Sequence, residues 1–526
     1  MKLVLLKNKQ KGIFNPGYVT IHGSLLELKN RGNRNRKVKK LMADNIKNVH
    51  RILRRPAKCG LDLGDGSERA EYVNQDYILN TLGRPHRNVN IMYTYYPKDK
   101  EWPQRISEAC KDMEIHFQWD YPYDDYFPYE GGAGGNLSGQ PFEQMRDIRR
   151  HGQDVTLTLT IDCSLSEEYL RAVARDLRTF GRMRLRINHE CDGDWFTHNK
   201  RFSYQEIADF FVKFCGIIKE EAPNVSTIFC AGSVLDPEDP ESKVGHEKEF
   251  TKAYQTADVW STDCYLALHY GWPFDICEKG SDSYAINPVE KFYQKLRHTV
   301  RHLAVLNGGK QQKLVVSEFN TDGDVTGPLH QAESIKRFIE RLKEEKSEEW
   351  FDGFSMYQFR DRGRLGLEIE DPNNSSVGIP QPLLKEYKEI LKDEYFLPCI
   401  EQMAEVSLPI VLRWGSAEDA EGVAFEIELE KTPEFFEMVF KEKLNLMIEV
   451  KGRWFYKAPE TERIDLMPLF FEESLAQAET VSVHIFAPPA SGENDASQGE
   501  DWAENYYCKM NMLPELRIRY EAVGQV

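Results

Sequence analysis

The stretch that decides the fold is Met183–Phe196, which reads MRLRINHECDGDWF. Apolar side chains at positions 183, 185 and 187 alternate with polar ones at 184, 186 and 188, and this period of two predicts a strand. The alternation stops just before Glu190, so this carboxylate stands where the strand ends and its loop begins. In a barrel enzyme that is the place of a catalytic group, although a lone strand-end acid more often caps a backbone or pairs with a neighbour such as Arg186.

Seven further segments have the pattern of a strand, and amphipathic helical patterns lie between most of them. The eight predicted strands are Asn88–Tyr95, Met113–Trp119, Asp154–Ile161, Met183–His189, Val225–Ala231, Val259–Tyr265, Lys313–Ser317 and Gly353–Phe359. Eight strands alternating with helices over about 300 residues favour the α/β class and a closed (β/α)₈ TIM barrel. The alternative is a doubly wound open sheet, but the glycines of residues 131–135 lack the G-x-G-x-x-G spacing of its phosphate-binding turn.

The two flanks of the barrel differ from it in pattern. Residues 396–526 contain short alternating runs separated by turns and acidic loops, which predict an accessory antiparallel β-sandwich. Residues 1–87 are an N-terminal extension, and its segment 31–58 holds eleven Lys and Arg and one acid. We expect that basic segment to be a solvated helix face rather than a patch for an anionic polymer. The barrel is then assigned to residues 88–395.

Composition argues against several classes of protein. The 526 residues include 68 Lys and Arg and 85 Asp and Glu, and the net charge of −17 argues against binding to nucleic acid or to an anionic membrane. No apolar run approaches the ~18 residues of a transmembrane helix. The apolar stretch within Met1–Lys7 is too short for a signal peptide, so we expect a cytoplasmic protein unless a leader has been removed. The ten cysteines include no C-x-x-C pair and are expected to be reduced.

A second predicted strand also reaches a carboxylate. Residues 313–319 read KLVVSEF, a short apolar run that leads to Glu318. Glu318 lies 128 positions after Glu190, or about three strand–helix units, which places the two acids on the fourth and seventh strands, across the barrel mouth from each other. Hydrolysis of a glycosidic bond requires such a pair, because one acid protonates the leaving oxygen while the other attacks the anomeric carbon or activates water.

These residues resemble a known family. The pattern R-x-x-H-E-x-x-G-x-W is similar to the acid/base motif of glycoside hydrolase family 26, which contains β-mannanases and lichenase-type β-glucanases; here it is formed by Arg186, His189, Glu190, Gly193 and Trp195. Residues 313–319 resemble the nucleophile strand of that family, and residues 258–265 resemble its sixth strand, where a Tyr hydrogen-bonds the nucleophile. The family belongs to a clan of retaining glycosidases built on (β/α)₈ barrels.

The resemblance implies a role for each matching residue. Glu190 is the acid/base and Glu318 the nucleophile, and the supporting residues are His189, Asn188, Arg186 and Tyr265. Asn188 is included because sister families place an Asn next to the acid/base. The predicted eighth strand departs from the family pattern, since residues 355–360 read SMYQFR and contain no Trp.

Aromatic residues follow several of the predicted strands. Rings at the rim of a cleft can stack on a pyranose while acids accept hydrogen bonds from its hydroxyls. The alternative is that the rings only pack the loops. The expected substrate-binding residues are Trp119, Asp120, Trp195, Phe196, Trp272 and Tyr357. After the last strand come Arg360, Arg362 and Arg364, for which we expect structural ion pairs rather than contacts to a charged sugar.

No cofactor and no metal are expected, since paired-acid chemistry needs neither. Zinc binding by an H-E-x-x-H motif would require a second His where Gly193 stands, and His298 and His302 have no strand-end carboxylate beside them. The sequence also has no G-x-S-x-G elbow and no P-loop.

The sequence therefore predicts a retaining glycoside hydrolase that cleaves β-type bonds of an oligo- or polysaccharide, with its carboxyl groups ~5–5.5 Å apart. A transglycosidase with the same intermediate and a non-catalytic glycan-binding barrel are the alternatives. In the C-terminal region, residues 454–456 (Trp-Phe-Tyr) would bind glycans or pack against the barrel, and we favour packing.

Overall fold

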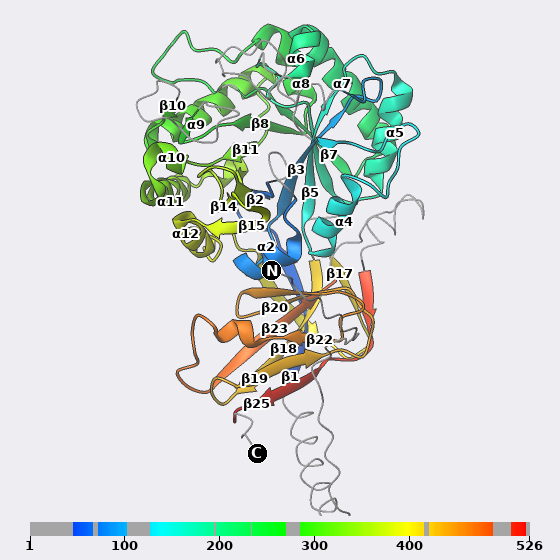
Figure 1. Cartoon of the computed structure of the whole chain (residues 1–526), viewed down its shortest axis with the longest axis vertical. Coiled ribbons are helices and arrows are strands. Elements are labelled where there is room, and N and C mark those ends of the chain that lie inside the picture. The colour runs from blue at the N-terminus through cyan, green and yellow to red at the C-terminus, as the bar shows by residue number, and fades with distance from the viewer. Residues whose placement is uncertain are drawn as a thin grey trace, which may run out of the picture.

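The computed structural model describes residues 46–66, 72–101, 127–193, 196–232, 234–269, 284–414, 420–487 and 507–521. Eight parallel strands form a closed barrel in the upper part of the molecule (Figure 1). In chain order they are β2 (Gly60–Gly64), β3 (Asn88–Tyr95), β5 (Asp154–Ile161), β6 (Met183–Ile187), β7 (Val225–Cys230), β8 (Val259–Asp263), β11 (Leu314–Phe319) and β12 (Phe351–Met356). Each strand pairs with the next, and pairing of β12 and β3 with β2 closes the ring. The α/β TIM-barrel class is therefore confirmed.

Helices cover the outside of the barrel, because the longer ones present an apolar stripe to the strands. They are α2 (Gln75–Leu82), α4 (Phe142–Arg150), α5 (Glu167–Arg178), α6 (Thr197–Arg201), α7 (Tyr204–Glu221), α8 (Glu247–Thr256), α9 (Val289–Leu306), α10 (Gly323–Thr326), α11 (Pro328–Glu344), the short η1 (Ser347–Glu349) and α12 (Pro382–Ile390). Helix α7 begins with a capping box in which Ser203 and Glu206 each bond the backbone of the other. No described helix is long and apolar enough to cross a bilayer.

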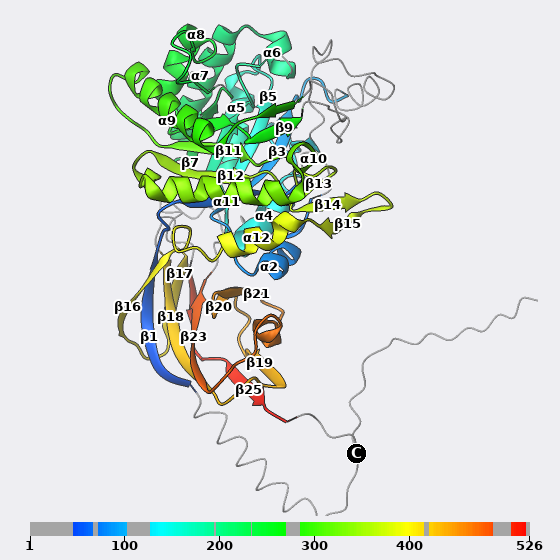
Figure 2. The ribbon, with the colours of Figure 1, turned by 90° about the vertical axis from the view of Figure 1, so that its left-hand side faces the viewer.

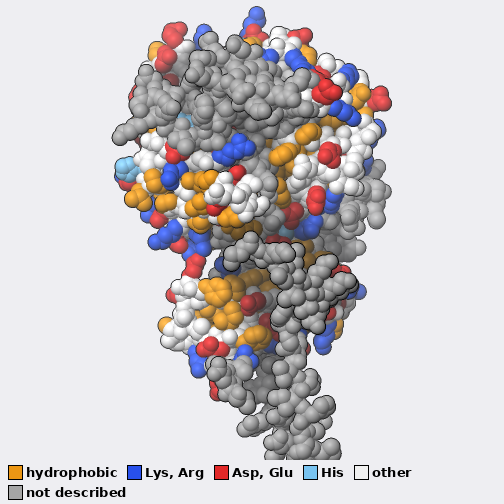
Figure 3. All heavy atoms as spheres, viewed as in Figure 1, with side chains coloured by type: hydrophobic (Ala, Val, Ile, Leu, Met, Phe, Trp, Pro, Cys, Tyr) orange, Lys and Arg blue, Asp and Glu red, His pale blue; other side chains and the backbone are white. Residues whose placement is uncertain are grey.

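Several short strands lie in the loops of the barrel. They are β4 (Phe127–Pro128), the hairpin of β9 (Ala267–His269) and β10 (Tyr284–Ile286), and a three-stranded sheet of β13 (Arg360–Asp361), β14 (Glu368–Asp371) and β15 (Asn374–Pro380). On the face drawn in Figure 3, basic and acidic side chains alternate over the described surface, so the acidic excess is not gathered into one patch there.

Two antiparallel sheets lie below the barrel and enclose a second core. The larger sheet has the order β16-β1-β18-β23-β20-β21, with β17 beside β18 and β24 beside β17, and the smaller has the order β22-β19-β25. Their bounds are β1 (Ile46–Arg55), β16 (Cys399–Glu405), β17 (Ile410–Trp414), β18 (Ala420–Leu429), β19 (Phe435–Val439), β20 (Leu446–Val450), β21 (Arg453–Lys457), β22 (Arg463–Asp465), β23 (Glu479–Phe486), β24 (Tyr507–Met510) and β25 (Glu515–Arg519), with η2 (Met467–Phe470) in a connection.

The larger sheet packs against the base of the barrel (Figure 2). Trp454 stacks on Phe486 within an apolar cluster that also contains Leu79 of α2, and its backbone N–H donates to the carbonyl of Gly83 at 2.6 Å. Trp454 and Phe455 are both buried. These contacts give residues 454–456 a packing role, the alternative favoured from the sequence.

The structure differs from the sequence expectations at the N-terminal side. The first barrel strand is β2, so the barrel begins before residue 88, and the segment Asn88–Tyr95 is the second strand. The predicted strand Met113–Trp119 lies outside the described residues. The basic segment is a strand over Ile46–Arg55, and it belongs to the C-terminal sheet.

A physical reason for this strand lies in its partners. Lys47, Arg51 and Arg55 form ion pairs with glutamates of the neighbouring strands β18 and β16. Cross-strand pairs of opposite charge stabilise a sheet, so the basic pattern that suggests a helix fits a strand between two acidic neighbours.

Candidate active site

The loop that carries Glu190 is fixed to the strands on both sides of β6. Asn188 and Glu190 have left-handed backbone angles, φ 57° and 43°, which are uncommon for residues other than glycine. The side-chain oxygen of Asn188 accepts from the N–H of Ile161 at 2.8 Å, and the N–H of Cys191 donates to the carbonyl of Cys230 at 3.0 Å. The surrounding hydrogen bonds thus hold a strained turn, as is common at functional sites. Asn188 supports Glu190 through the backbone.

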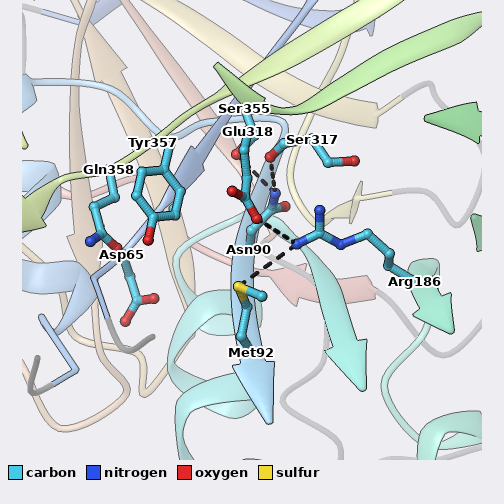
Figure 4. A pocket seen from close by; sticks show the side chains of 10 residues that line it. Asp65, Asn90, Met92, Arg186, Ser317, Glu318, Ser355, Tyr357 and Gln358 are labelled. Carbon is cyan, nitrogen blue, oxygen red and sulfur yellow. Dashed lines mark hydrogen bonds and ion pairs between the residues drawn. The ribbon is translucent and has the colours of Figure 1, made fainter. Parts of the chain in front are cut away.

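Glu318 projects from β11 toward the middle of the barrel mouth (Figure 4). The hydroxyl of Tyr265 donates to its Oε2 at 2.8 Å, and Nη2 of Arg186 donates to its Oε1 at 3.1 Å. Nε2 of His189 lies 3.2 Å from the same Oε1. Hydrogen bonds and a positive charge on a buried carboxylate stabilise its ionised form, which is the form that can act as a nucleophile.

Arg186 joins two buried carboxylates. Its Nη1 is 3.0 Å from both carboxylate oxygens of Asp263, while its Nε donates to the hydroxyl of Thr158 at 2.7 Å. Burial raises the pKa of Asp263, and the Arg186 charge opposes that shift. The guanidinium is therefore the fixed cation that allows two acids to be buried side by side.

His189 completes this arrangement as a neutral ring. Burial, together with the nearby charge of Arg186, holds its pKa well below the usual value. Its Nδ1 lies 3.4 Å from the carboxylate of Asp263, so the ring is held between Asp263 and Glu318. His189, Asp263 and Glu318 are ligand types that can bind a metal, but Arg186 already supplies a positive charge between the two carboxylates.

The two acids lie close to each other. Nε2 of His189 is 3.9 Å from Oε2 of Glu190 and 3.2 Å from Oε1 of Glu318. Because both distances end on one nitrogen, these two oxygens are at most 7.1 Å apart, the total of the two distances. This limit includes the ~5–5.5 Å of a retaining pair and the lower part of the ~6.5–9.5 Å range of inverting pairs. The side chain of Glu190 is 23% exposed and that of Glu318 is 8% exposed, so Glu190 is the more accessible acid.

A small cavity adjoins Glu318. Asp65, Asn90, Tyr357 and Gln358 line it with Glu318, and its volume of about 10 Å³ is room for about one water (Figure 4). The ring of Tyr357 meets that of Tyr265 edge to face with centroids 6.0 Å apart. Tyr357 therefore stands beside Glu318.

The predicted substrate-binding residues have different outcomes. Trp119, Asp120, Trp195 and Trp272 lie outside the described residues. The expectation for Phe196 is corrected, because its ring is 1% exposed and packs edge to face on His189 with centroids 4.9 Å apart. Phe196 supports the histidine from behind and presents no face to the cleft.

Two of the three arginines after the last strand form the ion pairs expected from the sequence, and Arg362 is exposed. Arg360 is buried against Glu368 at 2.9 Å, and Arg364 pairs with Asp324 at 3.2 Å. On the helix α9, His302 contacts Glu247 at 2.7 Å, on the outer side of the barrel.

Sequence reasoning missed three site residues. Asp263 stands two positions before Tyr265 within the quoted sixth strand, so the same motif could have indicated it. Asp65 follows β2, a strand that the sequence pattern did not reveal, and Gln358 follows β12, a strand without a sugar-site signature.

No protein-family model matches the sequence, and no curated protein matches it. Among solved structures, the chain is similar to a family 39 glycoside hydrolase from Bacteroides cellulosilyticus WH2, with 11% identity, a TM-score of 0.38, and 82% of this chain and 81% of that chain covered. It is also similar to a family 26 β-mannanase from Bacteroides ovatus (10% identity, TM-score 0.39, coverage 64% and 90%). A third such structure is an α-L-arabinofuranosidase from Thermotoga maritima (10% identity, TM-score 0.39, coverage 84% and 98%). Likeness at this level carries no argument about activity.

Proposed function

We propose that the protein is a retaining glycoside hydrolase that cleaves β-type glycosidic bonds of an oligo- or polysaccharide. The observation that carries the proposal is the placement of Glu190 and Glu318 at the ends of the fourth and seventh barrel strands, both in contact with one nitrogen of His189. The limit of 7.1 Å between their oxygens leaves room for the short separation that double displacement requires.

In the first half-reaction, Glu318 attacks the anomeric carbon while Glu190 protonates the departing oxygen. Tyr265 and Arg186 each hold one oxygen of Glu318, so the carboxylate presents one orientation to the sugar. The neutral ring of His189 places its Nε2 at 3.2 Å from the same carboxylate without adding a second positive charge.

In the second half-reaction, water displaces Glu318 from the glycosyl-enzyme intermediate. Glu190, now ionised, removes a proton from that water, so the carboxyl that acted as an acid becomes a base. The partial exposure of Glu190 supports this role, because the proton has to pass between the residue and groups that arrive from solvent. Tyr357 and Asp65 line the small cavity beside Glu318.

Two alternatives use the same residues. A transglycosidase would pass the glycosyl group from Glu318 to a second sugar in place of water, and a glycan-binding barrel would retain the site without turnover. Arg186 and Tyr265 favour the enzyme, since both contact the carboxylate of Glu318 directly and a binding protein needs no such activation of a carboxylate.

The test is turnover of aryl β-glycosides and of β-glucans, β-mannans and β-xylans, with products followed by NMR. We expect a first-formed product of retained anomeric configuration, complete loss of activity in Glu318→Gln, and unchanged activity in Glu247→Gln, a control acid paired with His302 outside the barrel.

Glu190→Ala separates the two roles of that residue. Poor leaving groups should suffer far more than activated aryl glycosides, which need little protonation, and added azide should restore turnover with a β-glycosyl azide as product. Full activity of Glu318→Gln, or an inverted first product, would contradict the proposal. Tight binding without turnover would favour the glycan-binding alternative.

A further inference from the structure

A second cleft lies at the opposite end of the barrel from Glu190 and Glu318, where the C-terminal sheets meet its base. It has a volume of about 670 Å³, within the usual range for ligand pockets, and such pockets often occur between domains. The barrel contributes the ends of α2 and α12, and the C-terminal region contributes the β20–β21 turn and residues 468–479, close to η2 (Figure 2).

Positive charge exceeds negative charge around this cleft, although the whole chain carries −17. Five cationic residues line it, against three glutamates: Arg84, Lys388, Lys392, Lys451 and Arg453, against Glu472, Glu473 and Glu479. Two of the glutamates are already paired, because Lys388 contacts Glu472 and Lys451 contacts Glu479, each at 2.8 Å.

The two arginines have no carboxylate partner among the described residues. Arg84 is 9% exposed, and its guanidinium donates to three backbone carbonyls, those of Pro85, Leu391 and Phe396. Burial lowers its pKa to about 10. A buried cation without a countercharge is costly even when its hydrogen bonds are made, so an anion in the cleft would relieve that cost.

Arg453 offers the open donor. Its Nη2 donates to the carbonyl of Asn80 at 2.8 Å, whereas its Nη1 makes no hydrogen bond in the part of the chain that the structure describes. Burial lowers the pKa of Arg453, and the nearby Glu472, which would oppose this shift, is engaged by Lys388. A guanidinium with an unused N–H is a donor suited to the oxygens of a carboxylate or phosphate.

We propose that this junction cleft is a binding site for a small molecule that carries a phosphate or carboxylate group, with Arg453 as the residue that contacts the anion. The lining contains no aromatic side chain on which a sugar could stack, so the charged group supplies the recognition. Leu82, Leu391, Leu469 and Leu475 provide an apolar wall for the rest of the molecule.

The experiment is calorimetric titration of the full chain with inorganic phosphate, glucose 6-phosphate, acetate and neutral glucose, all at one ionic strength kept with chloride. Phosphate should bind and neutral glucose should not bind at this cleft. If glucose 6-phosphate binds more tightly than inorganic phosphate, the ligand class is a phosphorylated metabolite. If acetate binds as tightly as phosphate, the ligand class is a carboxylate.

Three variants test whether phosphate binds in this cleft and through Arg453. Loss of a charge-assisted contact in Arg453→Met should weaken phosphate binding about tenfold or more, whereas Lys443→Met, whose lysine pairs with Glu460 elsewhere, should bind as wild type. Glu473→Gln should bind phosphate more tightly, because it removes a repelling charge from the lining, and a folding defect cannot produce a gain.

Glu318→Gln should leave phosphate binding unchanged, which separates this site from the proposed catalytic one. Absence of binding by every anion, or equal phosphate affinity in wild type and Arg453→Met, would overturn the proposal.

Discussion

Replacing Arg186 with Met tests the charge arrangement on which the candidate site depends. The Arg186 side chain is 1% exposed and contacts the carboxylates of Asp263 and Glu318. Methionine keeps part of the apolar stem and removes the charge. Two buried carboxylates then remain close together without the cation that now lies between them.

The size and the pH dependence of the effect follow from these contacts. Removing one partner of a buried ion pair costs about 3–5 kcal/mol, and we expect the free energy of unfolding to fall by about that amount near neutral pH. Burial already raises the pKa of Asp263, and loss of Arg186 should raise it further. The folded variant then keeps a proton that the unfolded chain releases. Its deficit should therefore grow as pH rises above the ordinary Asp range and shrink as pH falls toward it.

Urea denaturation near pH 5 and near pH 8, on the two sides of the expected pKa change, measures both effects. Arg337→Met is the matched control, because Arg337 forms an exposed pair with Glu333 one helical turn away, and such pairs contribute about 0.5 kcal/mol or less. A loss below about 1 kcal/mol in Arg186→Met, or an equal loss at both pH values, would refute the reasoning.

Three further substitutions test other parts of the structure. Trp454→Ala should lower the free energy of unfolding by about 3–5 kcal/mol, since it opens a cavity in the cluster between barrel and sheets, and an unchanged denaturation midpoint would count against that packing. Asp352 at the barrel base is partly buried, which alone would raise its pKa, but Arg87 and Arg184 hold that pKa well below its usual range. Its contribution to stability is thus present above the ordinary Asp pKa and lost as pH falls. Asp352→Asn should therefore destabilise the protein at neutral pH. The difference in unfolding free energy between wild type and variant, measured at decreasing pH, should narrow below about pH 4. Gly232→Ala should reduce kcat in an aryl-glycoside assay, because position 232 has φ +90° and a Cβ there would lie 2.9 Å from Oδ1 of Asp192, two residues from Glu190; unchanged kcat would show that this loop tolerates the strain.

The barrel and the positions of the two acids could be predicted because the evidence for them is local in sequence. Apolar runs such as 314–316 must be strands when buried on both faces, and a carboxylate directly after such a run has to stand at the strand end. Counting strand–helix units then places Glu190 and Glu318 on strands four and seven, where the structure also has them.

The missed elements depend on partners that are distant in sequence. Strand β2 reads GLDLG and contains two apolar side chains, so no run of hydrophobic residues marks it. It is a strand because β12 and β3 lie on its two sides, and Asp62 within it pairs with Arg87 at 2.6 Å. Strand β1 likewise takes its structure from acidic neighbours that lie more than 300 residues away in the chain, as in the pair of Lys47 with Glu428. Single-sequence periodicity contains no information about such partners.

The position of β1 also bears on the role of the C-terminal sheets. This strand lies between β16 and β18, so segments on both sides of the barrel in sequence build one sheet. That sheet contacts α2 at the barrel base through Trp454 and Phe486, and the chain passes between sheet and barrel both before β2 and after α12. Two chain crossings and a shared apolar cluster restrain the barrel base more than a single flexible linker would. The C-terminal sheets therefore act as a brace on the base, while the opposite end of the barrel, where the strands end, is left to the loops that carry Glu190 and its neighbours.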